Sequence, residues 1–283
     1  MTARVVRVSP DWLALREPAD AAARSRDLAD VLARRPITGR RLIHDLGGGT
    51  GSMGRWLAPR LPGPQHWVIH DRDADLLWLA AAHPPRRSAD GAAVTVETRQ
   101  SDIIRLDPGE LAGAHLVTAS ALLDMLTAAE LAAVVAVCLA PRCPVLLTLS
   151  VVGRVNLTPA DPLDGRVAAT FNDHQRRKTE RGRLLGPDAV AAAVGAFGDA
   201  GAEVLVRDSP WRLGAARAAL AAEWLRGWVG AASVQDAALA AEADDYTRRR
   251  LGQLAAGELT ITVGHADLLV LPAHSVSKRD ESA

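Results

Sequence analysis

The residues that most clearly promise chemistry in this chain are two acidic side chains and a glycine-rich turn. An apolar run from Leu42 ends at Asp45 and passes into a turn with glycines at positions 47, 48, 49 and 51, and a second apolar run, about twenty residues further on, ends at Asp71. Glycines let a ligand approach the bare backbone, and a carboxylate can bind an ammonium group or a pair of hydroxyls. This order is typical of a nucleoside-bearing cofactor bound at the edge of a parallel sheet.

The overall composition limits the class of protein. The chain has 283 residues, 48% of them hydrophobic, and a formal net charge of zero, so it has no electrostatic footprint for nucleic acid or an anionic membrane. Its two cysteines, Cys138 and Cys143, are too few for a disulfide framework or a structural zinc site, and no metal site is expected. It contains no apolar stretch long enough to span a membrane and no signal peptide, which predicts a cytoplasmic protein.

The elements that must position these acids alternate along the chain. Short apolar runs without clean alternation predict buried strands at 41–46, 66–70, 94–98, 114–119, 144–151, 203–207 and 259–271. Helical patterns lie between or around them, at 11–35, 52–60, 73–82, 127–139, 213–232 and 235–255, with a further helix beginning at Gly186. Thr127 followed three residues later by Glu130 is a capping box. Strand–helix repetition of this kind predicts a doubly wound α/β sheet.

The glycine turn also carries a family resemblance. Asp45, Gly47, Gly49 and Gly51 form the pattern acid-x-Gly-x-Gly-x-Gly, which resembles motif I of the class I S-adenosylmethionine-dependent methyltransferases. The segment His115–Ser120 resembles motif IV of the same family. The resemblance covers roughly residues 35–210. It implies a Rossmann-like, mostly parallel seven-stranded sheet with an antiparallel last strand and a helical cap.

The resemblance assigns roles within the turn and at the strand ends. Asp45 would face the ammonium group of the methionine moiety, Asp71 the ribose hydroxyls, and Asp102 the adenine amine. S-adenosyl-L-methionine would be the cofactor and S-adenosyl-L-homocysteine the product. The implied cofactor-binding set is Asp45, Gly47, Gly48, Gly49, Gly51, Asp71, Arg72, Ser101, Asp102, Ile103, Ala119 and Ser120.

Two regions are candidates for the acceptor site. Asp124, after the motif IV segment, is either an acid that faces the acceptor or a helix N-cap, and the first reading makes it a candidate catalytic residue. In the polar stretch 153–186, His174 could serve as a general base because its ordinary pKa lies near neutrality. Asn172, Arg176 and Arg177 could then bind a polar or anionic acceptor; the alternative is a solvated loop.

The expected organisation is one domain with a cap. We expect cap helices at 1–40, a methyltransferase domain at 41–272 with cap insertions at about 153–186 and 210–257, and a disordered tail at 273–283. Near the N-terminus, Arg16 and Arg24 could reach the methionine carboxylate or lie on the surface. Assembly as a monomer or a homodimer stays open.

The expected function is methyl transfer to oxygen, nitrogen or carbon of a small molecule. One alternative comes from Gly49, Gly51 and Gly54, which also fit the dinucleotide fingerprint G-x-G-x-x-G, with Asp71 at a suitable distance. An NAD(P)-dependent oxidoreductase would need hydride-transfer machinery, and the one tyrosine, Tyr246, has no lysine near it in sequence. The other alternative is a methyltransferase-like protein that binds a nucleoside without catalysis.

Overall fold

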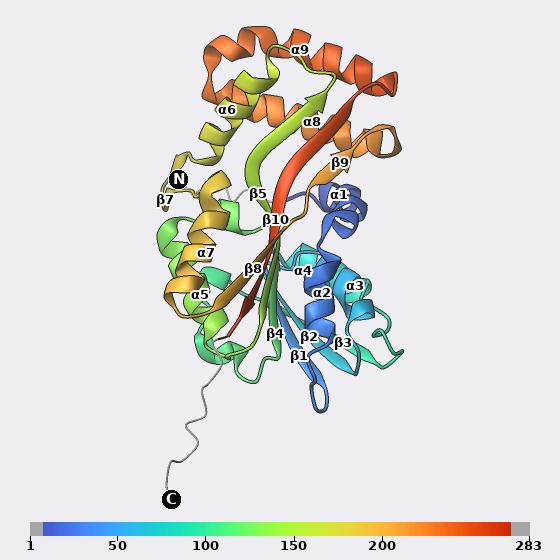
Figure 1. The fold of residues 1–283 in the computed structure, drawn as a ribbon, viewed down its shortest axis with the longest axis vertical. Coiled ribbons are helices and arrows are strands. Elements are labelled where there is room, and N and C mark those ends of the chain that lie inside the picture. The colour runs from blue at the N-terminus through green and yellow to red at the C-terminus, as the bar shows by residue number, and fades with distance from the viewer. Residues whose placement is uncertain (1–7, 273–283) are drawn as a thin grey trace, which may run out of the picture.

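A mixed β-sheet runs through the middle of the molecule in this computed structural model, which describes residues 8–272 (Figure 1). The tail expected to be disordered, 273–283, lies outside the described residues. The strands are β1 (Arg41–Leu46), β2 (Gln65–Asp71), β3 (Val94–Gln100), β4 (Leu116–Ser120), β5 (Val145–Thr158), β8 (Glu203–Asp208), β9 (Trp211–Leu213) and β10 (Thr260–Leu271). Their order is β3-β2-β1-β4-β5-β10-β8, with β9 paired beside β10.

The direction of the strands confirms the predicted fold class. β1 to β5 run parallel to one another, and β10 runs antiparallel to both β5 and β8. The seven strands of the main path are therefore Rossmann-like and doubly wound, with an antiparallel last strand. The eighth strand, β9, was not predicted; it pairs with the outer half of β10, where Val263 lies opposite Trp211.

Helices cover both faces of the sheet (Figure 1). α5 (Ala128–Leu139) and α7 (Ala189–Asp199) pack on one face, and α2 (Arg26–Ala33), α3 (Ser52–Leu57) and α4 (Ala74–Ala82) pack on the other. The predicted capping box at the start of α5 is present, with Thr127 and Glu130 each accepting from the other's backbone. Buried aliphatic side chains fill both interfaces, so the sheet is a rigid platform for groups at its edges.

A second layer of helices lies beyond one end of the sheet. β5 and β10 extend past their neighbours, and α6 (Asp164–Gln175), α8 (Ala218–Gln235) and α9 (Ala237–Ala255) lie over their far ends (Figure 1). α1 (Pro10–Ala23) joins the same apolar cluster, which includes the buried side chains of Trp211, Trp228 and Tyr246. This cap has its own core, separate from the cores on the two faces of the sheet.

The helix predicted for 11–35 is wrong as a single element. The chain leaves the helical conformation at Arg24, and Ser25 starts α2 by accepting a hydrogen bond from the Leu28 amide. The Ser25 amide in turn donates to the carboxylate of Asp267 on β10, at 2.7 Å. Because this contact spans most of the chain, the periodicity of the segment does not reveal it.

The boundary between the fifth strand and the polar stretch 153–186 is also corrected. The strand continues to Thr158, and exposure alternates over its last residues, from exposed Arg154 to buried Leu157. A strand that is covered on one face only alternates apolar and polar residues, so its sequence resembles that of a polar loop. The rest of the stretch forms α6 and the short hairpin of β6 (Lys178–Thr179) and β7 (Gly182–Arg183).

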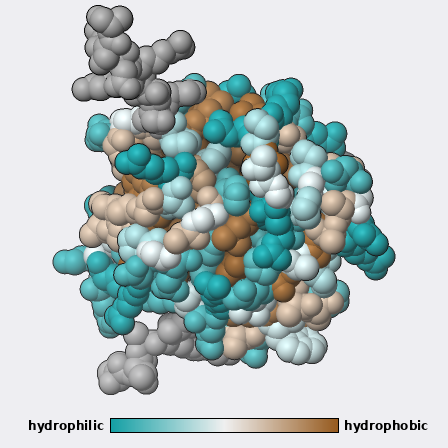
Figure 2. Space-filling view, turned by 90° about the horizontal axis from the view of Figure 1, so that it is seen from below, coloured by the Kyte–Doolittle hydropathy of each residue, from teal (hydrophilic) through white to brown (hydrophobic). Residues whose placement is uncertain are grey.

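At the end of the sheet opposite the cap, the surface of the molecule is largely polar. Figure 2 shows that face from below, with hydrophilic residues predominating and hydrophobic ones in small patches. None of the helices within residues 8–272 combines the length and apolarity needed to cross a membrane.

Candidate functional site

A cavity of about 690 Å³ lies between the carboxyl ends of the parallel strands and the cap. Its walls come from the glycine turn, the residues that follow β2, β3 and β4, and parts of α1, β5, α6, β9, α8 and β10. The sequence-predicted residues that line it are Asp45, Gly47, Gly48, Gly49, Asp71, Arg72, Ser101, Asp102, Ile103, Ser120, Asp124 and Asn172. Those belonging to the glycine turn and to the ends of β2 and β3 are called the inner wall below.

The glycine turn is shaped by its neighbours in space. Gly47 and Gly49 have φ of +62° and +52°, in the region that favours glycine. A Cβ atom on Gly48 would lie 2.5 Å from the Asp45 Oδ2 atom and 2.7 Å from Ile69. The Gly48 amide donates to the His70 carbonyl, which ties the turn to β2. No larger side chain fits at position 48 without displacing Asp45.

Asp45 has one carboxylate oxygen satisfied and one left without a partner. Thr118 donates to its Oδ1 at 2.7 Å, whereas Oδ2 is buried and has no hydrogen-bond partner among the described residues. Burial raises the pKa of Asp45 to about 7, against the hydrogen bond from Thr118 and the positive charge of Arg24. Because buried polar atoms are normally paired, Oδ2 marks a place where a ligand donor fits.

The other two acids of the inner wall lie at the ends of neighbouring strands. Asp71 accepts hydrogen bonds from the amides of Gly49 and Asp73, both at 2.9 Å. Asp102 accepts from the Ile104 amide at 3.2 Å and begins a 3₁₀ turn. A carboxylate has about four acceptor positions, so each acid keeps room for donors from a ligand. Both carboxylates are held in place by backbone amides.

A histidine pair that was not predicted lies behind these acids. His44 Nδ1 and His70 Nε2 are 2.9 Å apart, and His70 Nδ1 is 3.1 Å from the Ser101 hydroxyl, which lines the cavity. Burial lowers the pKa of His44 to about 4 and also lowers that of His70, so both rings are neutral at pH 7. The chain of contacts crosses β1, β2 and the end of β3 and fixes the orientation of Ser101.

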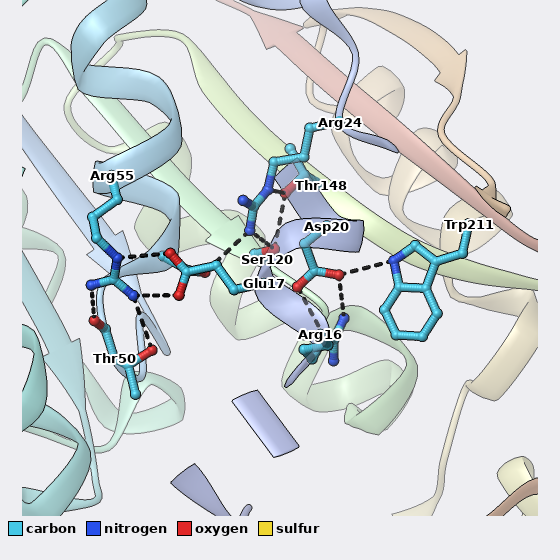
Figure 3. A network of polar contacts seen from close by, with 10 residues as sticks. Arg16, Glu17, Asp20, Arg24, Thr50, Arg55, Ser120, Thr148 and Trp211 are labelled. Atoms are coloured by element: carbon cyan, nitrogen blue, oxygen red, sulfur yellow. Dashed lines mark hydrogen bonds and ion pairs between the residues drawn. The ribbon is translucent and has the colours of Figure 1, made fainter. Parts of the chain in front are cut away.

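Helix α1 covers the glycine turn, as Figure 3 shows. Glu17 on α1 forms a two-bond ion pair with Arg55 on α3, with distances of 2.7 and 2.6 Å. At the end of α1, Arg24 donates to the hydroxyls of Ser52 and Ser120. Arg24 is 2% exposed, and Arg16 lines the cavity, so neither side chain lies on the surface.

The opposite side of the cavity is called the outer wall here. Its residues come from segments that are far apart in the chain, and they include seven aromatic or aliphatic side chains and eight polar or charged ones. They are Trp12, Arg16, Asp20, Asp124, Met125, Arg154, Val155, Phe171, Asn172, Gln175, Arg181, Trp211, Trp224, Val263 and His265.

A polar cluster organises the centre of the outer wall (Figure 3). Arg16 donates to both oxygens of Asp20, at 2.9 and 3.3 Å, and the Trp211 indole donates to Asp20 at 2.9 Å. The Arg16 guanidinium lies 4.9 Å from the centre of the Trp211 ring. This cluster joins α1 to β9 and fixes the ring of Trp211 beside the cavity.

Asp124 and His265 also belong to the outer wall. Burial raises the pKa of Asp124 to about 6, against its own amide and the charges of Arg16 and Arg177. His265 donates from Nδ1 to the Val263 carbonyl at 3.0 Å, which leaves its Nε2 as an acceptor. Burial lowers the pKa of His265 to about 4, so the ring is neutral. His265 was missed because in sequence it reads as part of a buried strand.

Five predicted site residues do not line the cavity. Gly51 caps α3, Ala119 is buried within β4, and His174, Arg176 and Arg177 lie at the end of α6. Phe171, Asn172 and Gln175 share one face of that helix because three or four residues make one turn. The segment is a helix rather than a loop, but its three basic residues lie outside the cavity, as the alternative of a solvated segment had it: Arg176, for example, pairs with Asp188 at 2.6 Å.

Two backbone positions at the cavity are strained. Ala121 and Leu149 have φ of 51° and 56°, a conformation that residues with a Cβ atom rarely adopt, and both line the cavity. The Leu149 amide donates to Asp267 at 2.8 Å, and the Ala121 amide donates to the Thr148 carbonyl. Strain of this kind gathers at functional sites and persists because the surroundings enforce it.

The described part of the chain contains no cluster of metal ligands. Within residues 8–272, no three His, Cys, Asp or Glu side chains are grouped so that they could hold a metal ion.

Comparisons with known proteins place the fold among solved structures. The chain matches no model of a protein family and no curated protein. It is similar to YjhP from Escherichia coli (15% identity, TM-score 0.45, 92% of this chain and 98% of that one). It is also similar to the mycolic acid cyclopropane synthase CmaA1 complexed with S-adenosylhomocysteine (12%, 0.48, 92% and 94%). A third is a SAM-dependent methyltransferase from Thiobacillus denitrificans, in complex with S-adenosylhomocysteine (13%, 0.46, 94% and 100%). At these identities the case for function rests on this chain's own residues.

Proposed function

We propose that this protein is an S-adenosylmethionine-dependent methyltransferase that acts on a small-molecule acceptor. The observation that carries the proposal is that Asp45 lines the cavity with a buried Oδ2 atom that has no partner among the described residues, beside a turn that excludes a side chain at Gly48. An ammonium group is the donor that such a carboxylate oxygen binds best. When bound, S-adenosylmethionine supplies an electrophilic methyl group on a positively charged sulfur.

The residues of the inner wall fit this cofactor in order along the strand ends. Asp45 would hold the methionine ammonium group, Asp71 the ribose hydroxyls, and Asp102 with Ile103 the adenine ring. Arg72, Ser101 and Ser120 complete the proposed contacts. These assignments remain predictions from the family resemblance, supported by the position of each side chain on one cavity.

The protein's contribution to methyl transfer would be alignment and exclusion of water. Transfer from a sulfonium needs an in-line approach and gains from proximity. α1 covers the glycine turn through Leu13, which approaches within 3.6 Å of a Cβ built on Gly49, and the cap closes the other side. A base is required only where the nucleophile must lose a proton.

The dinucleotide alternative is not favoured by the geometry. Of its three fingerprint glycines, Gly51 is the one that should approach the pyrophosphate, and it does not line the cavity. The cavity instead presents the carboxylates of Asp45, Asp71 and Asp102, which would repel a pyrophosphate. A protein that binds the nucleoside without catalysis is separated from an enzyme only by turnover.

Calorimetry with purified protein tests the proposal directly. We expect S-adenosylmethionine and S-adenosylhomocysteine to bind and NAD⁺ not to bind. Formation of S-adenosylhomocysteine in the presence of a mixed library of hydroxy and amino compounds would then identify an enzyme. Preferential binding of NAD⁺, or no binding of either sulfur nucleoside, would refute the proposal.

A pair of glycine variants tests whether the inner wall is the binding site. Gly48→Ala places a Cβ atom 2.5 Å from Asp45 Oδ2 and should lower the affinity for S-adenosylhomocysteine at least tenfold. Gly195→Ala on α7 meets nothing within 4 Å and should leave affinity unchanged, while adding up to about 1 kcal/mol of stability because alanine favours helix. Equal affinity in both variants would place the ligand elsewhere.

A further inference from the structure

The apolar residues of the outer wall indicate what kind of molecule can bind there. Trp12, Phe171, Trp211 and Trp224 line the cavity from four different elements, and the rings of Trp12 and Trp211 lie edge to face with centroids 6.4 Å apart. Aromatic rings favour flat apolar partners, which they bind by stacking and edge contacts. An acceptor that fills this side is therefore mostly apolar and at least partly flat.

The arginines of the outer wall are already engaged by carboxylates. Arg16 is held by Asp20, as described above. Arg154 pairs with Asp208 at 3.2 Å, and Arg181 pairs with Glu130 at 2.6 Å. Each of these arginines keeps further N–H donors, but its charge is balanced by the neighbouring carboxylate, so the wall has no surplus positive charge to favour a phosphate or a carboxylate ligand.

Three polar side chains on the outer wall have atoms that are free to accept hydrogen bonds. Among the described residues, the carboxyl group of Asp124 receives a hydrogen bond from its own amide and none from another side chain. His265 offers its neutral Nε2, because Nδ1 donates to the Val263 carbonyl. Gln175 Oε1 is buried without a partner. A ligand that satisfies these atoms must bring N–H or O–H groups.

We propose that the acceptor is an uncharged, flat, apolar molecule with a hydroxyl or amino group, and that Asp124 takes the proton which this group loses. The inference rests on the proposed methyltransferase function. It replaces the expectation of an anionic acceptor bound by Arg176 and Arg177, since neither side chain lines the cavity.

The proposed step balances in atoms and charge. As the nucleophilic oxygen or nitrogen bonds to the methyl carbon, the carbon–sulfur bond breaks and its electron pair stays on sulfur, which becomes neutral. The proton of the hydroxyl or amino group passes to the Asp124 carboxylate. A carboxyl group with a pKa of about 6 is largely ionised at pH 7 and can accept that proton.

Binding of matched aromatic probes tests the chemical class without turnover. Quenching of tryptophan fluorescence, with S-adenosylhomocysteine saturating, would compare 2-naphthol, 2-naphthylamine, 2-naphthoic acid and 2-naphthyl phosphate. We expect at least one of the two neutral compounds to bind tenfold or more tighter than either anion; which of the two does so distinguishes a hydroxyl from an amino acceptor. Tighter binding of an anion, or no difference, would overturn the inference.

Variants of Asp124 test its role in proton removal. Asp124→Asn should lower turnover of a neutral acceptor by about a hundredfold and leave the affinity for S-adenosylhomocysteine unchanged. With S-adenosylmethionine saturating at every pH, the rate of the parent enzyme should fall as the pH drops below about 6, where Asp124 gains a proton while the nearby Arg16 and Arg177 stay charged. The variant should lose that dependence. Asp199→Asn, at an exposed helix end, is the control that keeps the parent rate and profile.

The two proposals fail in different ways. Absence of S-adenosylhomocysteine binding in the parent protein would refute the proposed function itself. Normal nucleoside binding with a preference for anionic probes, or an Asp124→Asn variant with the parent rate and pH profile, would refute the acceptor class or the proton transfer while leaving the function intact.

Discussion

The inner and outer walls face the same cavity but are built in different ways. The inner wall comes from turns that directly follow β1, β2 and β3, and backbone amides hold two of its acids, Asp71 and Asp102. The outer wall draws on segments from Trp12 to His265, and at its centre Arg16, Asp20 and Trp211 are held by one another. A site fixed by local backbone suits an invariant ligand, whereas a site assembled from distant side chains can change one residue at a time. The inner wall is therefore suited to a common cofactor, and the outer wall to an acceptor that is particular to this protein.

Asp267 joins segments that are far apart in the chain, and its removal should have the largest effect on stability. Its buried carboxylate accepts from the amides of Ser25 and Leu149 and from the Ser209 hydroxyl, at 2.7, 2.8 and 2.6 Å. Asp267→Ala leaves these buried donors without an acceptor and should cost about 3–5 kcal/mol in the free energy of unfolding. Urea denaturation followed by circular dichroism measures it.

Two further variants sharpen that result. Asp267→Asn keeps an acceptor oxygen of the same shape and should lose less stability than the alanine variant. Asp199→Ala, on the exposed end of α7, should change the unfolding free energy by less than about 0.5 kcal/mol. A stability loss at Asp267 no larger than at Asp199 would mean that this carboxylate does not join the start of α2 and β5 to β10.

Asp71 tests the inner wall alone. Asp71→Ala removes a charged acceptor for ribose hydroxyls and releases the Gly49 amide, and should weaken S-adenosylhomocysteine binding by about 2–4 kcal/mol. Calorimetry measures the affinity, and fluorescence titration with a neutral aromatic probe measures the outer wall in the same variant. Unchanged nucleoside affinity would show that the ribose is bound elsewhere.

Asp45 should make cofactor affinity depend on pH. Its pKa in the folded protein, about 7, is raised by burial, so the carboxyl is largely protonated below pH 7 and cannot pair as an anion with an ammonium group. Affinity for S-adenosylhomocysteine should therefore rise as the pH increases from 5 to 7, by up to about tenfold per unit, and then level off. Binding below pH 7 should release a proton, which calorimetry in buffers of different ionisation enthalpy detects.

The matched variant for this dependence is Asp45→Asn. The amide has no charge to gain, so its affinity should be weaker than that of the parent at pH 7.5 and flat between pH 5 and 7. A slope that persists in the variant would assign the titration to a group other than Asp45.

The sequence predicted the inner wall because that wall follows the order of the chain. Parallel strands bring their carboxyl ends to one edge, so Asp45, Asp71 and Asp102 had to meet there. The outer wall depends on tertiary contacts: whether His174 or His265 faces the cavity is decided by the turn of α6 and by the extension of β5 and β10. His174 was predicted as a site residue because it lies in a polar segment, whereas His265, which does line the cavity, was not predicted because it lies in a buried strand. Local patterns carry no information on either point.

Trp211 tests the outer wall with the smallest expected effect. Trp211→Phe keeps an aromatic ring but removes the indole donor, which leaves one oxygen of buried Asp20 with only its bond to Arg16. Binding of a neutral aromatic probe should weaken by about 1 kcal/mol, the contribution of one hydrogen bond, as measured by fluorescence titration of the remaining tryptophans. Nucleoside affinity in the same variant should stay at the parent value. Within residues 8–272, the Trp211 side chain forms its hydrogen bond with Asp20 and none with a residue of the inner wall. A parallel loss of both affinities would mean that the two walls are coupled through α1. In that helix Asp20 accepts a hydrogen bond from Trp211 of the outer wall, and Glu17 pairs with Arg55 beside the glycine turn.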